Sequence, residues 1–96
     1  MGIALADQAA PVDKSADATG TNTSDASVGP VMTTAPGIIF AAAIFANVGA
    51  PGAKFTQRSN FAHNLAEDQS SPAPGNLKAT FANDPQDWIA QLVAIK

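Results

Sequence analysis

Residues 37–49 read GIIFAAAIFANVG and form the centre of 28 consecutive residues without a formal charge. Pro36 precedes this stretch, Pro51 follows it, and alanine fills its middle. Proline in front, glycine and proline behind, and helix-forming alanine between them favour a short helix over about 37–48. Because isoleucine and phenylalanine cluster in 37–45, a strand over those residues stays open as the alternative.

A helix over 37–48 would be apolar on nearly every side. Phe40, Ile44 and Val48 would share one face. Ile38 and Phe45 would share another, seven residues apart. Such a helix must be buried on most of its surface, and we expect another protein chain to bury it.

The same segment raises the alternative of a membrane span over residues 36–53. Acidic residues precede it and Lys54 and Arg58 follow it, which is the charge asymmetry of a membrane segment. A spanning helix needs about 20 mainly apolar residues. This core is shorter and contains the polar Asn47. We therefore keep a small membrane-associated or single-pass subunit of a membrane complex as the second hypothesis.

The C-terminal segment predicts a helix over about 85–95. Asp84 is placed as its N-cap and Pro85 as its first residue. The apolar residues that follow have helical spacing: Trp88, Ile89, Leu92, Val93 and Ile95. A helix of this length is not stable alone in water, so its apolar face must pack against something else.

A third helix is predicted over about 60–67, with Ser59 or Asn60 as its cap. Two prolines and a glycine mark a loop over 69–76. Residues 77–81 are then a brief strand or an extended connector.

The first third of the chain is acidic and of low complexity. Residues 15–30 contain a single valine among Ser, Thr, Ala, Asp, Asn, Gly and Pro. Asp7, Asp13, Asp17 and Asp25 face one lysine, and this third carries the whole net charge of −3. Such a composition buries too little apolar surface to offset its ordering entropy. We expect an extended arm over 1–30 and a small packing region over 31–96.

The apolar content predicts little autonomous core. Hydrophobic residues make up 46% of the 96, but 21 of them are alanine, which offers little area for burial. A chain of this size is already marginal in the surface that it can bury. The expected fold is a small, mostly irregular or extended chain with short α-helices over about 37–48, 60–67 and 85–95, a few short β-strands at most, and little core.

Composition and motifs exclude several classes of function. Without cysteine there is no disulfide, zinc-thiolate site or thiol nucleophile. The net charge of −3 with only five Lys and Arg argues against nucleic acid as a partner. His63 has no second histidine; a metal held by His63, Glu67 and Asp68 is conceivable, but a solvated or interface histidine is the ordinary interpretation. We expect no catalytic, metal or cofactor-binding residues, no cofactor and no enzymatic activity.

What is left is the profile of a structural accessory subunit. The N-terminus has no basic residue before Lys14, so no secretory signal is expected. The composition is similar to that of small bacteriophage virion proteins, such as capsid decoration, cement or tail accessory proteins. We therefore expect a non-enzymatic protein of a virion or cytoplasmic assembly, bound in many symmetric copies to larger structural proteins. The candidate interface residues are Ile38, Phe40, Ile44, Phe45, Val48, Trp88, Ile89 and Leu92.

Overall fold

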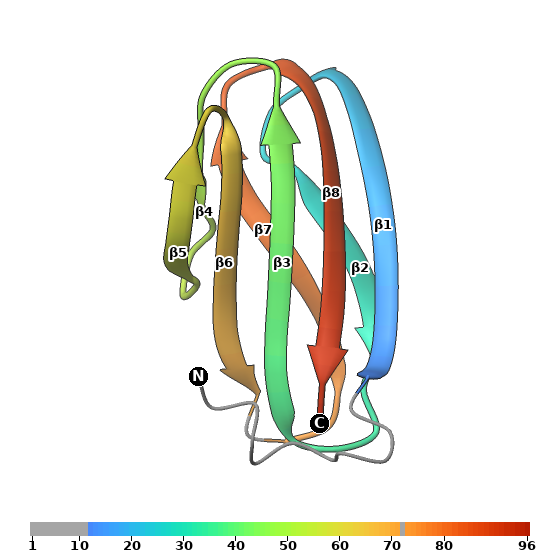
Figure 1. Ribbon diagram of the computed structural model, residues 1–96. Coiled ribbons are helices and arrows are strands. Elements are labelled where there is room, and N and C mark those ends of the chain that lie inside the picture. Colours follow the sequence, from blue (N-terminus) through green and yellow to red (C-terminus); the bar gives the residue numbers. More distant parts are fainter. Residues whose placement is uncertain (1–11, 72) are drawn as a thin grey trace.

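Two antiparallel β-sheets face each other in the computed structural model, which describes residues 12–71 and 73–96 (Figure 1). The five-stranded sheet has the order β1 (Val12–Thr23), β8 (Gln86–Ile95), β3 (Gly37–Phe45), β6 (Asn64–Ser71), β5 (Thr56–Phe61). The three-stranded sheet has the order β2 (Ser27–Met32), β7 (Asn76–Asn83), β4 (Gly49–Pro51). Neither range contains a helix, so the expectation of an irregular chain with short helices is wrong.

The central stretch is strand β3, the middle strand of the larger sheet. Ile39, Ala41, Ala43 and Phe45 point into the sandwich and are buried. The alternate residues, from Ile38 to Ile44, point outward. Because both sets are apolar, the alternation of apolar and polar residues that marks a strand is absent. The high helix propensity of alanine then favours the wrong element. The helix over 37–48 is therefore wrong, and the strand left open over 37–45 is correct.

Residues 36–53 contain β3 and β4 with a loop between them. The helix on which the membrane alternative depended is therefore not formed. Within residues 12–71 and 73–96, no helix is long and apolar enough to cross a membrane.

The C-terminal helix is also wrong, because residues 86–95 form β8. Its buried positions are Trp88, Ala90, Leu92 and Ala94, a strict period of two. If Ala90 and Ala94 are not counted as core residues, the large apolar side chains that remain in 86–95 have the spacing of a helix. Asp84 and Pro85 lie in the turn between β7 and β8, since residues that favour a helix cap also favour turns.

The expected helix over 60–67 is instead the hairpin of β5 and β6. Ala62 and His63 form its turn, and both have positive φ angles, 52° and 67°. This is the backbone conformation of a two-residue type I′ turn. The expected loop over 69–76 begins only after Ser71, where β6 ends. Residues 77–81, the brief strand or connector, lie within β7.

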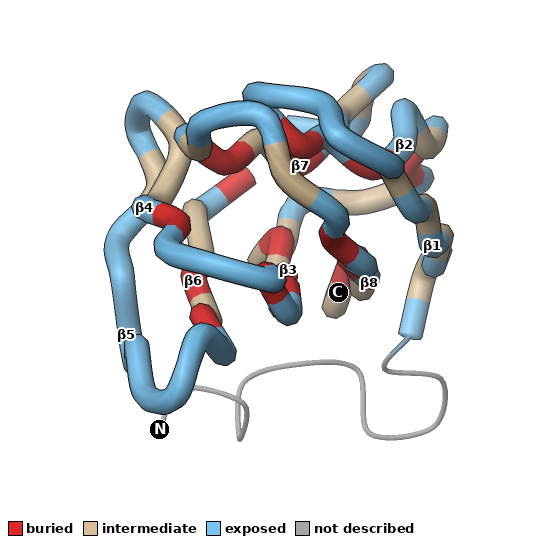
Figure 2. The backbone as a smooth tube through the Cα atoms, turned by 90° about the horizontal axis from the view of Figure 1, so that it is seen from above, coloured by how far each residue is buried: buried red, intermediate tan, exposed pale blue. Residues whose placement is uncertain are grey.

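The core lies between the two sheets, as the buried segments in Figure 2 show. Leu65 and Leu92 of the larger sheet and Val28 of the smaller one are among its fully buried side chains. The rings of Phe45 and Phe81 meet edge to face, with centroids 5.8 Å apart. The remaining core positions include many alanines: Ala26, Ala41, Ala43, Ala79, Ala90 and Ala94. The expectation of little core is therefore wrong, because buried alanines pack between the two sheets together with the large apolar side chains.

Residues 12–30 of the expected arm form β1 and the first part of β2, while residues 1–11 lie outside the described residues. Polar side chains join β1 to its neighbours. The Asp13 carboxylate accepts hydrogen bonds from the Thr34 backbone N–H (2.6 Å) and hydroxyl (2.7 Å), which lower the pKa of Asp13. The Trp88 indole N–H donates to the Thr23 hydroxyl at 2.9 Å. The boundary expected after residue 30 falls inside β2.

Candidate functional site

The five-stranded sheet has one face on the core and one that nothing in the described structure covers. We call the second one the outer face: it consists of the outward-pointing side chains of β1, β8, β3, β6 and β5, the sheet that lies nearer the viewer in Figure 1. Residues directly opposite each other on neighbouring strands point to the same side of a sheet. The strand register therefore arranges the outer face in rows. One row, named here the central row, consists of Thr19, Ile89, Ile44, Asn64 and Phe61.

The central row exposes large apolar side chains. Ile44 is 57% exposed, Ile89 54% and Phe61 82%. The solvent face of an antiparallel sheet ordinarily carries polar residues. Here the outward residues of β3 are all apolar, and Val93 and Ile95 of β8 continue the apolar surface beside them. A contiguous apolar surface of this kind marks a contact site for another molecule.

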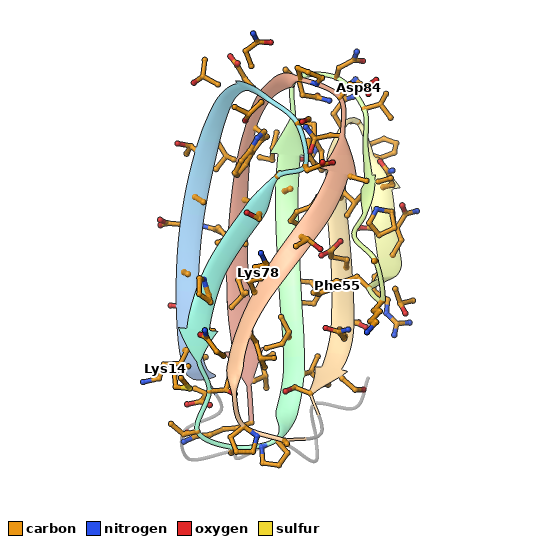
Figure 3. All side chains as sticks on the ribbon, turned by 180° about the vertical axis from the view of Figure 1, so that it is seen from behind. Lys14, Phe55, Lys78 and Asp84 are labelled. Atoms are coloured by element: carbon orange, nitrogen blue, oxygen red, sulfur yellow. The ribbon has the colours of Figure 1, made fainter. Side chains whose placement is uncertain are left out.

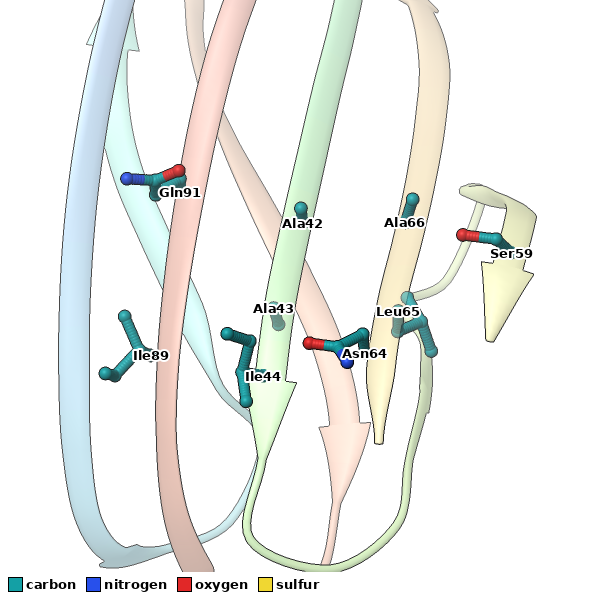
Figure 4. Close-up of a pocket in the computed structure, with 9 residues that line it drawn as sticks. All are labelled: Ala42, Ala43, Ile44, Ser59, Asn64, Leu65, Ala66, Ile89 and Gln91. Carbon is teal, nitrogen blue, oxygen red and sulfur yellow. The ribbon is translucent and has the colours of Figure 1, made fainter. Parts of the chain in front are cut away.

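The outer face is hollowed on both sides of Ile44 and Ile89. One hollow, of about 360 Å³, is lined by Ala42, Ala43, Ile44, Ser59, Asn64, Leu65, Ala66, Ile89 and Gln91. Figure 4 shows Ile89, Ile44 and Asn64 across three strands, with Gln91, Ala42 and Ala66 in the next row. A second hollow, of about 390 Å³, is lined by Thr19, Gly20, Thr21, Ile44, Phe45, Ala46, Asp87, Trp88 and Ile89. Ile44 and Ile89 line both hollows and so form a ridge between them.

Charges lie at the two sides of the outer face and at the start of β8, where Asp87 lines the second hollow. On the β1 side, Asp17 stands opposite Gln91. On the β5 side, the Arg58 guanidinium donates to both carboxylate oxygens of Asp68, from Nε at 2.6 Å and from Nη2 at 3.0 Å. This ion pair raises the pKa of Arg58. Between them, the outward positions 38–44 of β3 and 89–95 of β8 carry no charge.

The edges of the five-stranded sheet are protected against further strand pairing. The register of β1 against β8 is irregular between Val12 and Lys14 and again between Gly20 and Thr23. The register of β5 against β6 is irregular around Arg58. Bulges and charged residues on edge strands oppose the addition of another strand. A partner of this sheet is therefore better accommodated on its face than along its edges.

The opposite side of the sandwich is more polar. On the solvent side of the three-stranded sheet, Lys78 lies in the middle of β7 (Figure 3). Thr80 lies on the same side of that strand, directly opposite Ser27 of β2. This face therefore lacks the apolar continuity of the larger sheet.

The candidate interface residues from the sequence divide into three groups. Ile38, Phe40, Ile44 and Ile89 lie together on the outer face. Phe45, Trp88 and Leu92 lie in the core, and Val48 is exposed in the loop after β3. Sequence reasoning missed several outer-face residues: Phe61, Asn64, Gln91, Val93 and Ile95. A strand period through residues 86–95, with alanine counted as a core residue, would have found the last three.

The residues considered for a metal site do not converge. His63 is exposed in the hairpin turn, Glu67 is buried on the core side of β6, and Asp68 points to the outer face. In residues 12–71 and 73–96, no group of three or more His, Cys, Asp or Glu side chains is arranged to hold a metal ion.

Glu67 is a carboxyl group inside the sandwich. One oxygen, Oε1, accepts a hydrogen bond from the Gly52 backbone N–H at 3.1 Å. The other, Oε2, is buried without a hydrogen-bond partner among the residues that the structure describes. Burial raises the pKa of Glu67 to about 7, against the weaker opposite effect of the Gly52 hydrogen bond.

No protein-family model, curated protein or solved structure matches this chain. Its own surface chemistry is therefore the basis for a functional proposal.

Proposed function

We propose that this protein is a non-enzymatic structural subunit that takes its place in a larger protein assembly through the outer face of its five-stranded sheet. The observation that carries the proposal is the exposed ridge of Ile44 and Ile89, 57% and 54% accessible, which continues the uncharged outward positions 38–44 of β3 and 89–95 of β8. Burying the exposed half of such a side chain contributes about 1 kcal/mol. Apolar residues at the centre of a patch with polar residues at its margin have the anatomy of a protein interface.

A bacteriophage virion is the assembly that we propose, with the chain as a decoration, cement or tail accessory protein. The support is compositional: a small, cysteine-free, alanine-rich chain without a recognisable catalytic motif. The mode of action differs from that of an arm that becomes ordered on its neighbours. A preformed sandwich loses less conformational entropy on binding. In a symmetric particle, many modest contacts of this kind add through effective concentration.

The test is to follow tagged variants through sedimentation of the assembled particle from the native host. We expect wild-type protein to sediment with the particle and Ile44→Ser/Ile89→Ser to be released, with affinity reduced about tenfold or more. The matched control is Met32→Ser/Val48→Ser, which removes apolar residues of similar exposure, 60% and 64%, away from the outer face. The control should stay bound. Wild-type protein that never sediments with a particle, or equal release of both variants, contradicts the proposal.

A further inference from the structure

We infer that the outer face pairs with the same face of a second copy of this chain, giving a two-fold dimer in which the two five-stranded sheets stack. This inference deepens the proposed function by naming the molecule that covers the outer face. Three features of the described residues support it: shape, area and charge.

The shape of the outer face is complementary to itself. The ridge of Ile44 and Ile89 has a hollow on either side, and Ala42 and Ala66 line one of these hollows. In a two-fold interface the same patch is used by both copies, so each protrusion must meet a depression of the same surface. About a two-fold axis parallel to β3 each row keeps its level, so Ile89 on β8 of one copy faces β6 of the other, where Asn64 and Ala66 line a hollow.

The area of the outer face suits a stable dimer. The molecule extends 38 × 24 × 21 Å, so the outline of its broad side is at most roughly 900 Å², which leaves room for the about 800 Å² that each partner buries in a standard interface. Stacked sheets pack about 10 Å apart with interdigitating side chains. The outward-pointing apolar side chains of β3 and β8 would form the centre of the contact, from which water is excluded.

The charges at the two sides match under one arrangement. The order β1, β8, β3, β6, β5 places β3 at the centre of the sheet. A two-fold axis parallel to β3 therefore lays β1 of one copy over β5 of the other. Asp17 and Ser59 belong to the same row of the register, so Asp17 of one copy comes to the level of Arg58 in the second. A guanidinium has five N–H donors, and the bonds to Asp68 use two of those on Arg58.

The first experiment is sedimentation equilibrium of the full chain over a wide concentration range. We expect wild-type protein to show a concentration-dependent mass of twice 9.7 kDa. Ile44→Asp/Ile89→Asp should be monomeric, with its dissociation constant raised about hundredfold or more, and should keep the wild-type circular dichroism spectrum. Met32→Asp/Val48→Asp adds the same charge at exposed apolar sites elsewhere and should remain dimeric.

The second experiment tests the orientation of the two copies by charge exchange. Asp17→Lys and Arg58→Glu should each weaken the dimer several-fold, and the double variant should recover part of the loss. Additive loss in the double variant would contradict the axis along β3.

A wild-type chain that stays monomeric at millimolar concentration overturns the dimer. So does a dimer that survives Ile44→Asp/Ile89→Asp, because another surface must then form it. If the chain is monomeric and Ile44→Ser/Ile89→Ser is still released from the particle, a different protein covers the outer face. In that event the proposed function stands while the dimer fails.

Discussion

Ala43→Asp is expected to destabilise the folded chain strongly, whereas the same substitution at the neighbouring Ala42 is expected to be tolerated. Ala43 is 3% exposed and points into the core from the middle strand of the larger sheet. An aspartate there would bury a charge without a partner, which costs roughly 3–5 kcal/mol. Since a domain of this size has only about 5–15 kcal/mol of stability, much of it would be lost.

Ala42 provides a matched control because it lies on the outer face and is exposed. Aspartate is a poor strand former, so Ala42→Asp should cost at most about 1 kcal/mol. The measurement is urea denaturation followed by circular dichroism, at a concentration low enough to keep the chain monomeric. Two equal losses of stability would mean that both residues are buried, as in a helix apolar on all sides, and would contradict the strand.

Raising the pH from about 4.5 to above 7 is expected to destabilise the folded chain through Glu67. The pKa of this carboxyl is about 7 in the folded protein and has its ordinary value of 4.5 in the unfolded chain. Between these values the folded state binds more protons than the unfolded state, so the free energy of unfolding falls as pH rises. The favourable contribution is complete below pH 4.5 and is lost above pH 7. The separation of the two pKa values corresponds to roughly 3 kcal/mol.

Glu67→Gln should remove this dependence, because a glutamine can still accept the Gly52 hydrogen bond but does not ionise. Melting temperatures between pH 4.5 and 8.5 should fall for the wild type and stay level for the variant. Asp13→Asn, compared with the wild type below pH 3.8, is the control of opposite sign. The Thr34 hydrogen bonds lower the pKa of Asp13, so its contribution to stability is lost as pH falls. Parallel curves for Glu67→Gln and wild type would mean that Glu67 is solvated.

The sequence locates the boundaries of several elements better than it identifies their type. The stretch left open as a strand over 37–45 has the bounds of β3, and proline and glycine mark the turns. The type was missed because the decisive period lies in alanine. Ala90 and Ala94 are two of the inward-pointing residues of β8, yet their small side chains contribute little to the apolar pattern of the sequence. Whether an alanine is core depends on which sheet lies opposite, and that is a long-range property.

In the candidate site, too, the sequence identifies some of the residues, whereas their arrangement depends on long-range strand pairing. Ile44 and Ile89 are candidate interface residues because of their places in two predicted helices, and the register of β3 against β8 brings them side by side. Phe61 was assigned to a helix, and only the hairpin turn brings it into the same row. Glu67 gave no sign of burial, because the carboxylate is enclosed only when the backbone at Gly52 passes over β6. Local sequence does not encode that crossing.

Methyl spectra of isoleucine distinguish the outer face from the core in a single sample. Ile38, Ile44, Ile89 and Ile95 point outward, whereas Ile39 is 2% exposed and serves as the internal reference. The measurement is a dilution series of isoleucine-methyl-labelled wild-type protein. If copies stack through the outer face, the outward methyl signals shift with concentration while that of Ile39 stays in place. Outward signals that do not change over the whole range, or shifts confined to residues of the three-stranded sheet, would contradict the stacking of two copies through the outer face.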